Sequence, residues 1–199
     1  MKLTNYGMPT LIETSTLEDC AKLCAELGLD FIELNMNMPQ YQLDKIDVEY
    51  FKRVADKYGI MLVLDASLLG ENAYLVKQRE EEWKENTMAD IIKMMTGLAD
   101  IVYFSARKLT SSRGGGICTN RKDYYKQMEP LITLFEGFLT YGGISIREIE
   151  AMAVGIYETI DETMISQSVD FIKYCVESAV KAGIPMVTPP GVLGAHVNA

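Results

Sequence analysis

The chain has 199 residues, of which 48% are hydrophobic and 24% charged, a composition typical of a globular protein with one sizeable domain or a domain and a half. Its net charge of −9 and its pI of about 4.7 argue against nucleic acid or an anionic membrane surface as a partner. Because no apolar run approaches the roughly 18 residues of a membrane span and no signal peptide is visible, we expect a cytoplasmic protein.

A helix, a glycine near its end and a short apolar strand recur along the chain. Residues 16–27 have apolar side chains at helical spacing, Ser15 and Glu18 form a predicted capping box, and Gly28 precedes a strand at 31–35. The same order predicts helices at 47–58, 87–96 and 161–182, followed by strands at 60–65, 100–105 and 184–187. This alternation predicts an α/β fold in three layers, with a mainly parallel sheet of about five or six strands.

Two further segments interrupt this pattern. Residues 110–120 are predicted to be a loop that ends in a short strand, and 121–160 to be two helices broken near 137–143. The second of these helices has an apolar stripe, which is typical of a core or dimer contact. The four cysteines lack the spacing of a zinc site and the chain has one histidine, His196, so no metal site is predicted.

The ends of two predicted strands carry an amine and a carboxylate. Asp65 ends the apolar run at 60–64, and Lys108 follows the run that begins at Ile101. We expect both runs to be buried parallel strands whose carboxyl ends form one edge of the sheet, where open α/β sheets place their sites. Such a pair is what a pyridoxal phosphate enzyme uses, the lysine forming a Schiff base and the carboxylate pairing with the pyridinium nitrogen. The alternatives are a solvated lysine and a carboxylate that caps a turn or helix.

A series of short motifs begins at Asp65. They are Asp65-Ala66-Ser67, Glu71-Asn72-Ala73-Tyr74, Lys77-Gln78-Arg79-Glu80, Ser105-Ala106-Arg107-Lys108, Gly114-Gly115, Glu136 to Gly143, Glu150 to Tyr157 and Ala182-Gly183-Ile184-Pro185. Through them, residues 62–199 resemble the β-eliminating lyases, the tryptophanase and tyrosine phenol-lyase group of fold-type I pyridoxal 5'-phosphate enzymes. The resemblance implies part of the large domain of such an enzyme.

The same resemblance implies roles for particular residues. Lys108 stands at the Schiff-base position and Asp65 at the position that pairs with the pyridine nitrogen, while Ser105 and Arg107 stand near the cofactor phosphate. The implied reaction is elimination at the β-carbon of an amino acid, which releases an aromatic leaving group, pyruvate and ammonia. The implied assembly is a homodimer or higher homo-oligomer, with the helix at 143–159 as the candidate contact.

Some features depart from the family pattern. Leu68 and Leu109 stand where the family has arginine and aspartate, and family members are more than twice as long. The parts without a counterpart here carry the glycine-rich phosphate loop, the residue that stacks on the ring and the substrate-binding arginine. An incomplete, inactive fragment of such a lyase is therefore one expectation, and a non-catalytic folded chimera is another.

Residues 1–60 resemble a different family. Met1 to Pro9 and Leu27 to Asn35 are similar to the opening βαβ of sugar phosphate isomerase/epimerase barrels. This resemblance places Glu33 at a metal-binding position and makes a sugar isomerase fragment an alternative function. Asn35 or Asn37 would stand near the phenolic oxygen of the cofactor under the lyase interpretation. We therefore expect a barrel-like segment at 1–60 joined to a partial lyase domain at 61–199 in one continuous fold.

Overall fold

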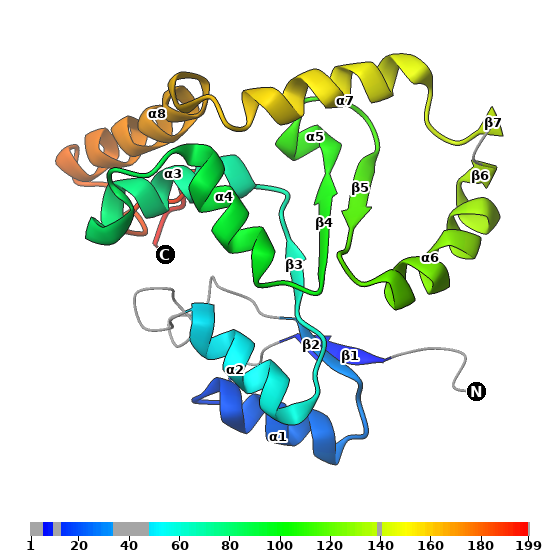
Figure 1. Ribbon diagram of the computed structural model, residues 1–199. Helices are drawn as coiled ribbons and strands as arrows, with labels where there is room; N and C mark the ends of the chain where they lie inside the picture. Colours follow the sequence, from blue (N-terminus) through cyan, green and yellow to red (C-terminus); the bar gives the residue numbers. More distant parts are fainter. Residues whose placement is uncertain (1–5, 10–12, 34–47, 139–140, 199) are drawn as a thin grey trace. The chain divides into compact units, whose positions relative to one another are not determined.

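The computed structural model describes residues 6–9, 13–33, 48–138 and 141–198 (Figure 1). The chain divides into two compact units. The first unit contains the residues up to Leu64 together with Gly97–Ile101, and the second contains Asp65–Thr96 and the residues from Val102 onward. The four predicted site residues all belong to the second unit.

The first unit begins with a parallel βαβ arrangement. Strands β1 (Gly7–Pro9) and β2 (Phe31–Glu33) pair in parallel, with Met8 opposite Ile32, and helix α1 (Leu17–Glu26) connects them. Helix α2 (Val48–Tyr58) follows, which confirms the helix predicted at 47–58. The buried residues Met8, Cys20 and Cys24 form a small core.

Helix α1 begins one residue later than the predicted capping box. The hydroxyl of Thr16, not that of Ser15, accepts a hydrogen bond from the Asp19 N–H at 3.1 Å. Threonine followed three residues later by an acidic residue is an equally good start signal, so the sequence pattern fitted both registers. The helix ends before Gly28, whose φ of +67° is the left-handed conformation that favours glycine at this position.

A three-stranded sheet has the order β3 (Val63–Asp65), β4 (Ile101–Ser105) and β5 (Gly115–Cys118). Strands β3 and β4 are parallel. Leu62 O accepts from the Asp100 N–H, and Tyr103 O accepts from the Ala66 N–H, so the residue numbers of the bonded partners increase in the same direction along both strands. Strands β4 and β5 are antiparallel.

The fold is mixed α/β, as predicted, but its strands are divided among three small sheets instead of one sheet of five or six strands within the described residues. The third sheet is an antiparallel pair, β6 (Gly137–Phe138) and β7 (Tyr141–Gly142). The short connection from β4 to β5 explains part of the difference, since a parallel neighbour would need a longer crossover.

Helices make up most of the second unit. They are α3 (Leu69–Arg79), the 3-10 turn η3 (Glu81–Trp83), α4 (Met88–Gly97), α5 (Ala106–Leu109), α6 (Lys122–Phe135), α7 (Ile146–Glu158) and α8 (Glu162–Lys181). Helix α3 was not predicted, whereas α4, α6, α7 and α8 confirm the predicted helices. None of the helices that the structure describes combines the length and the apolar character needed to cross a bilayer.

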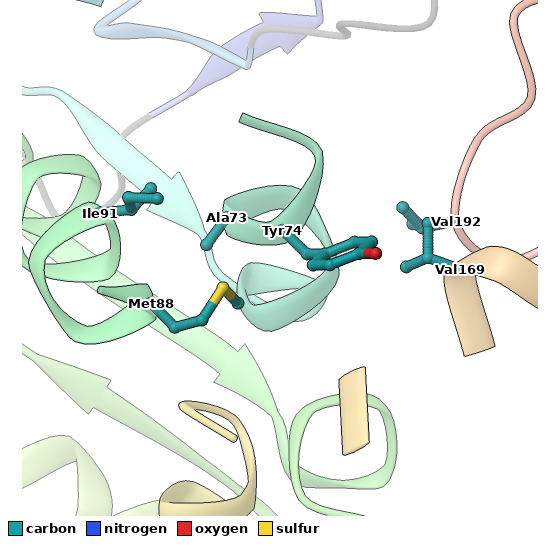
Figure 2. Packing of buried hydrophobic residues seen from close by; sticks show 6 residues of the cluster. All are labelled: Ala73, Tyr74, Met88, Ile91, Val169 and Val192. Carbon is teal, nitrogen blue, oxygen red and sulfur yellow. The ribbon is translucent and has the colours of Figure 1, made fainter. Parts of the chain in front are cut away.

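The core of the second unit joins segments that are far apart in the sequence. Figure 2 shows it, with the Tyr74 ring directed toward Val169 and Val192. Its six buried residues are Ala73, Tyr74, Met88, Ile91, Val169 and Val192. They come from α3, α4, α8 and the C-terminal segment, so burial of apolar surface holds these four segments together.

The predicted strand at 184–187 is reduced to an isolated bridge. Met186 and Val197 pair in antiparallel orientation, and Val187 N–H donates to His196 O at 2.8 Å. Val187 and Val197 are exposed, so little apolar burial stabilises a longer ladder here.

Candidate functional site

The carboxyl ends of β3 and β4 lie side by side. Asp65 is the last residue of β3 and Ser105 the last of β4, and Ala66 N–H donates to Tyr103 O at 2.7 Å just beyond the end of β3. Strand β4 is half-buried and β3 is exposed at Val63 and Asp65, so the prediction that both strands are buried is wrong. The shared edge nevertheless brings the predicted residues to one end of the sheet.

Asp65 is exposed and forms a turn. Its Oδ1 atom accepts a hydrogen bond from the Ser67 N–H at 2.9 Å, as the alternative interpretation of this residue predicted. Its Oδ2 atom has no hydrogen-bond partner within the part of the chain that the structure describes. The carboxylate therefore has one oxygen that fixes its own orientation and one that faces a ligand or solvent.

Ser67 connects the two strand ends. It is buried, and its Oγ accepts from the Ser105 N–H at 3.0 Å. Asp65 and Ser105 are thus linked through one serine, which donates its N–H to the Asp65 carboxylate and accepts from the Ser105 N–H with its hydroxyl. Sequence reasoning included Ser67 in a family motif but gave it no role.

The segment that carries Arg107 and Lys108 is fixed through its first residue. Ala106 is fully buried, and its carbonyl oxygen accepts from Thr110 N at 2.9 Å, from Thr110 Oγ1 at 2.9 Å and from Ser112 N at 3.2 Å. The Thr110 and Ser112 hydroxyls are also 2.8 Å apart. This network leaves the backbone of the segment little freedom, because each of these polar groups is already satisfied.

Arg107 and Lys108 themselves are exposed. Neither forms an ion pair with any residue that the structure describes. Their charges are therefore available to an anionic or carbonyl-containing ligand at the edge of the sheet.

The glycine run after this segment serves close packing. Ala106 N–H donates to Gly114 O at 3.0 Å, and Gly115 pairs with Ser105 across β4 and β5. A Cβ on residue 115 would lie 2.4 Å from Phe104 O, and one on residue 116 would lie 2.6 Å from the Phe104 ring. A side chain at 115 would therefore displace the backbone of β4, whereas one at 116 would require the Phe104 ring to move.

Buried polar side chains concentrate around Lys108. Four of the five buried polar side chains among the described residues surround this segment, and each is hydrogen-bonded. They are Ser67, Thr110, Ser112 and Thr159, and the fifth is Thr14. No periodic signal marks these residues in the sequence, because their role depends on which carbonyls and amides the fold places beside them.

Two surface hollows lie away from these residues. A surface hollow of about 220 Å³ is lined by Glu18, Tyr50 and Arg53 with neighbouring residues of α2, and a smaller one is lined by apolar residues between Leu17 and Leu62. Both belong to the first unit and neither includes a predicted site residue.

The residue expected at a metal-binding position and the asparagines expected near the phenolic oxygen of the cofactor belong to the first sixty residues. Glu33 is exposed at the end of β2, and no group of three or more His, Cys, Asp or Glu side chains that could hold a metal occurs among the described residues. Asn35 and Asn37 lie outside the described residues.

Comparison with known proteins gives relatives named tyrosine phenol-lyase and tryptophanase. The chain is 37% identical over 177 residues to a tyrosine phenol-lyase from Pasteurella multocida, a match that covers 85% of the chain and 39% of that protein. It is 34% identical over 149 residues to a tryptophanase from Salinibacter ruber, covering 74% of the chain and 32% of that protein. No family model matches the sequence. The chain thus spans about a third of the length of the curated relatives it matches.

Solved structures share the fold. A crystal structure from Exiguobacterium sp. 255-15, described as a candidate aromatic amino acid β-eliminating lyase/threonine aldolase, matches with a TM-score of 0.60 at 20% identity and covers 92% of the chain and 48% of that structure. A candidate L-allo-threonine aldolase from Listeria monocytogenes matches with a TM-score of 0.58 at 14% identity. The fold therefore resembles the lyase and aldolase domains of fold-type I pyridoxal phosphate enzymes over about half of their chains.

These findings support the resemblance to the β-eliminating lyases. The tyrosine phenol-lyase match covers more of the chain than residues 61–199 contain, so it extends into the first sixty residues. The similarity of residues 1–60 to sugar isomerase barrels finds no support among these relatives. The division into a barrel-like segment and a lyase segment stays a prediction.

Proposed function

We propose that this chain carries the cofactor-anchoring part of a pyridoxal 5'-phosphate-dependent lyase that eliminates a side chain from an amino acid. The observation that supports this most directly is the set of buried, hydrogen-bonded hydroxyls around the Lys108 segment. Burying polar groups costs free energy unless they are paired, so such a cluster is expected where the backbone position must be fixed.

The donor set fits this cofactor. The exposed Lys108 amine is the attachment point for the cofactor aldehyde, and Asp65 holds a proton on the pyridine nitrogen with the oxygen that Ser67 leaves unused. Arg107 and the Ser105 hydroxyl bind the phosphate. When bound, the cofactor supplies an electron sink that weakens the bonds at the amino-acid α-carbon.

The two departures from the family pattern bear on the extent of this activity. Leu68 packs against the core of the second unit, and Leu109 is half-buried and offers its carbonyl to Thr159. Both positions therefore support the scaffold and contribute no charge to the site. We propose attachment of the cofactor as the activity of these residues, and elimination of an aromatic leaving group from an amino acid as the activity of a whole lyase that contains them.

Trapping of the cofactor tests the proposal. The protein is incubated with pyridoxal phosphate, reduced with borohydride, digested and mapped by mass spectrometry. We expect the adduct on Lys108 and its loss in Lys108→Ala. The control is Lys122→Ala, which removes an equally exposed helical lysine and should leave the adduct unchanged. An adduct spread over surface lysines, or one unchanged in Lys108→Ala, contradicts the proposal.

A second substitution separates the charge of the Asp65 carboxylate from its role in the turn at the end of β3. Asp65→Asn keeps an oxygen that accepts from the Ser67 N–H but removes the charge. We therefore expect a folded protein whose spectrum after cofactor binding shows a less protonated ring. If Asp65→Asn binds the cofactor and the spectrum is unchanged, the role of Asp65 is limited to accepting the hydrogen bond of the turn.

The assembly is part of the same proposal. The outer face of α7 exposes Ile146, Val154 and Tyr157, of which Tyr157 is 75% exposed. Such a face is typical of contacts between subunits, so we propose a homodimer through α7. Tyr157→Glu should shift the sedimentation coefficient toward the monomer, whereas Tyr174→Glu on α8, which is 69% exposed, should not. Equal sedimentation of both variants and the parent would exclude α7 as the contact.

A cytoplasmic location also belongs to the proposal. All four cysteines are free in the structure. Free cysteines are typical of compartments that keep thiols reduced, and a disulfide found in the purified protein from its natural source would argue against this location.

A further inference from the structure

Helix α7 is attached at two places to the segment that carries Lys108. At its start, the Glu148 Oε2 atom accepts from the Arg113 N–H at 2.9 Å, and at its end Thr159 donates to Leu109 O at 3.2 Å. The attachments are eleven residues apart along the helix, or about 16 Å at the usual rise per residue. Figure 1 shows α7 lying across α5 and the adjacent end of β5. One rigid helix therefore spans both ends of the segment 109–113.

The contact near the end of α7 is the closer one. Gly155 is buried, and a Cβ placed on it would lie 2.5 Å from Thr110 O and 2.7 Å from Thr110 Cα. The helix backbone thus lies directly against the backbone that follows Lys108. Glycine is required there because any side chain would push the two backbones apart.

Thr159 joins the two backbones through its hydroxyl. It is 5% exposed, and its Oγ1 lies 2.9 Å from Gly155 O and 3.2 Å from Leu109 O. Leu109 directly follows Lys108, so this hydrogen bond sets the position of the peptide group next to the lysine. A methyl group in place of the hydroxyl would leave Leu109 O without this donor in a partly buried place.

We propose that α7 is the element that positions Lys108, with Thr159 and Gly155 as positioning residues that act on the amine through the Leu109–Thr110 backbone. This inference rests on the proposed function of Lys108. The inference goes beyond that function, because it assigns the orientation of the Lys108 amine to a helix that contributes no group to the cofactor. The lysine-bearing turn is only four residues long, and its own hydrogen bonds converge on the Ala106 carbonyl, whereas the Leu109 carbonyl accepts from Thr159.

The test compares Thr159→Val with Thr159→Ser. Valine keeps the shape and removes the hydroxyl, whereas serine keeps the hydroxyl. The matched control is Thr96→Val, which removes a comparable bond from a threonine hydroxyl to Ile92 O at 2.8 Å within α4. Two quantities are measured: amide hydrogen exchange of the peptide that covers residues 106–112 without cofactor, and the pH profile of cofactor trapping on Lys108.

In Thr159→Val we expect exchange at 106–112 to be faster by roughly two- to tenfold, as loss of one hydrogen bond predicts. Trapping on Lys108 should fall by a similar factor and its pH midpoint should move. Thr159→Ser and Thr96→Val should match the parent in both measurements. The proposal is overturned if Thr159→Val matches the parent in both measurements. It is also overturned if Thr96→Val changes exchange at 106–112 and trapping on Lys108 as much as Thr159→Val does.

The other attachment provides a second test if Thr159→Val does not fold. Glu148 is only half-buried, so Glu148→Ala is expected to fold, and Glu148→Gln retains an acceptor for the Arg113 N–H. Faster exchange at 106–112 in the alanine variant but not in the glutamine variant supports the proposal, and equal exchange in both contradicts it. Since exchange needs no cofactor, it tests the role of α7 even if Lys108 does not bind pyridoxal phosphate.

Discussion

The two units bury different kinds of side chain. The described core of the first unit consists of Met8, Cys20 and Cys24, and the one polar residue buried in that unit is Thr14 among those described. The second unit has a larger apolar core around Ile91 and, apart from it, the hydroxyl cluster around Lys108.

The difference shows how a structural core and a site can be distinguished. An apolar core is stabilised by contacts that have no preferred direction, although the core is close-packed. Hydroxyls that bind particular carbonyls and amides tolerate only one backbone position, because a displaced donor in a buried place loses its partner. Directional burial near an exposed, unpaired lysine therefore indicates a site more strongly than the lysine does by itself.

Thiol reactivity gives the largest expected contrast. Cys118 on β5 is exposed, Cys20 is fully buried, and burial raises the pKa of the Cys24 thiol. Because the thiolate is the reacting form, we expect Cys118 to react with iodoacetamide orders of magnitude faster than Cys20 or Cys24, as measured by mass spectrometry. Cys118→Ser should remove the fast phase. Equally fast reaction of Cys20 would mean that the core of the first unit is not formed in solution.

Truncation in the core of the second unit should have the largest effect on stability. Ile91 is fully buried, so Ile91→Ala is expected to lower the free energy of unfolding by about 2–5 kcal/mol. Ile132 on α6 is 45% exposed, and Ile132→Ala should change the free energy of unfolding by only about 0.5 kcal/mol. Chemical denaturation measures both. A small loss in Ile91→Ala would contradict the central place given to this core.

The start of α1 tests the first unit separately. Thr16→Ala removes the capping hydroxyl and should cost about 1 kcal/mol, whereas Ser15→Ala should cost almost nothing. The measurement is the rate at which Cys20 becomes reactive, which reports local opening of the first unit. A larger effect from Ser15→Ala would restore the capping box predicted from the sequence.

Glu71 gives the smallest expected effect, and it depends on pH. Burial raises the pKa of this carboxyl on α3 from its ordinary value of 4.5. The folded state therefore binds the proton more tightly than the unfolded state, and stability falls as the pH rises from about 4.5 through the folded pKa. Glu71→Gln should remove this fall and raise stability slightly at neutral pH.

Urea titrations of the Glu71 variant at several pH values provide the check. Glu150 on α7 is exposed, and Glu150→Gln serves as the control that should follow the parent at every pH. A stability difference between Glu71→Gln and the parent that stays constant or shrinks as the pH rises over this window would contradict a raised pKa of Glu71.

The sequence predicted local features well where the signal was local. Helical spacing gave α2, α4 and α8 to within one residue and α7 to within three, and the motifs around Asp65 and Lys108 led to relatives that comparison confirmed. Helix α3 was missed because Asp65 to Tyr74 was interpreted only as family motifs. The single large sheet was also wrong for the described residues, since apolar runs do not specify which strands pair.

The sequence by itself predicted that Asp65 ends one strand and that Lys108 follows the next, and it gave the chemistry that an amine and a carboxylate offer; in the structure Lys108 lies in the short helix α5 directly after β4. Only the tertiary structure decided that Ser67 joins the two strand ends and that Gly155 and Thr159 hold the backbone after Lys108. The bond from Ser105 to Ser67 and the contacts of Gly155 and Thr159 join residues 38 to 50 positions apart. A hydrogen bond depends on the distance and angle between two atoms, which spacing along the chain does not encode.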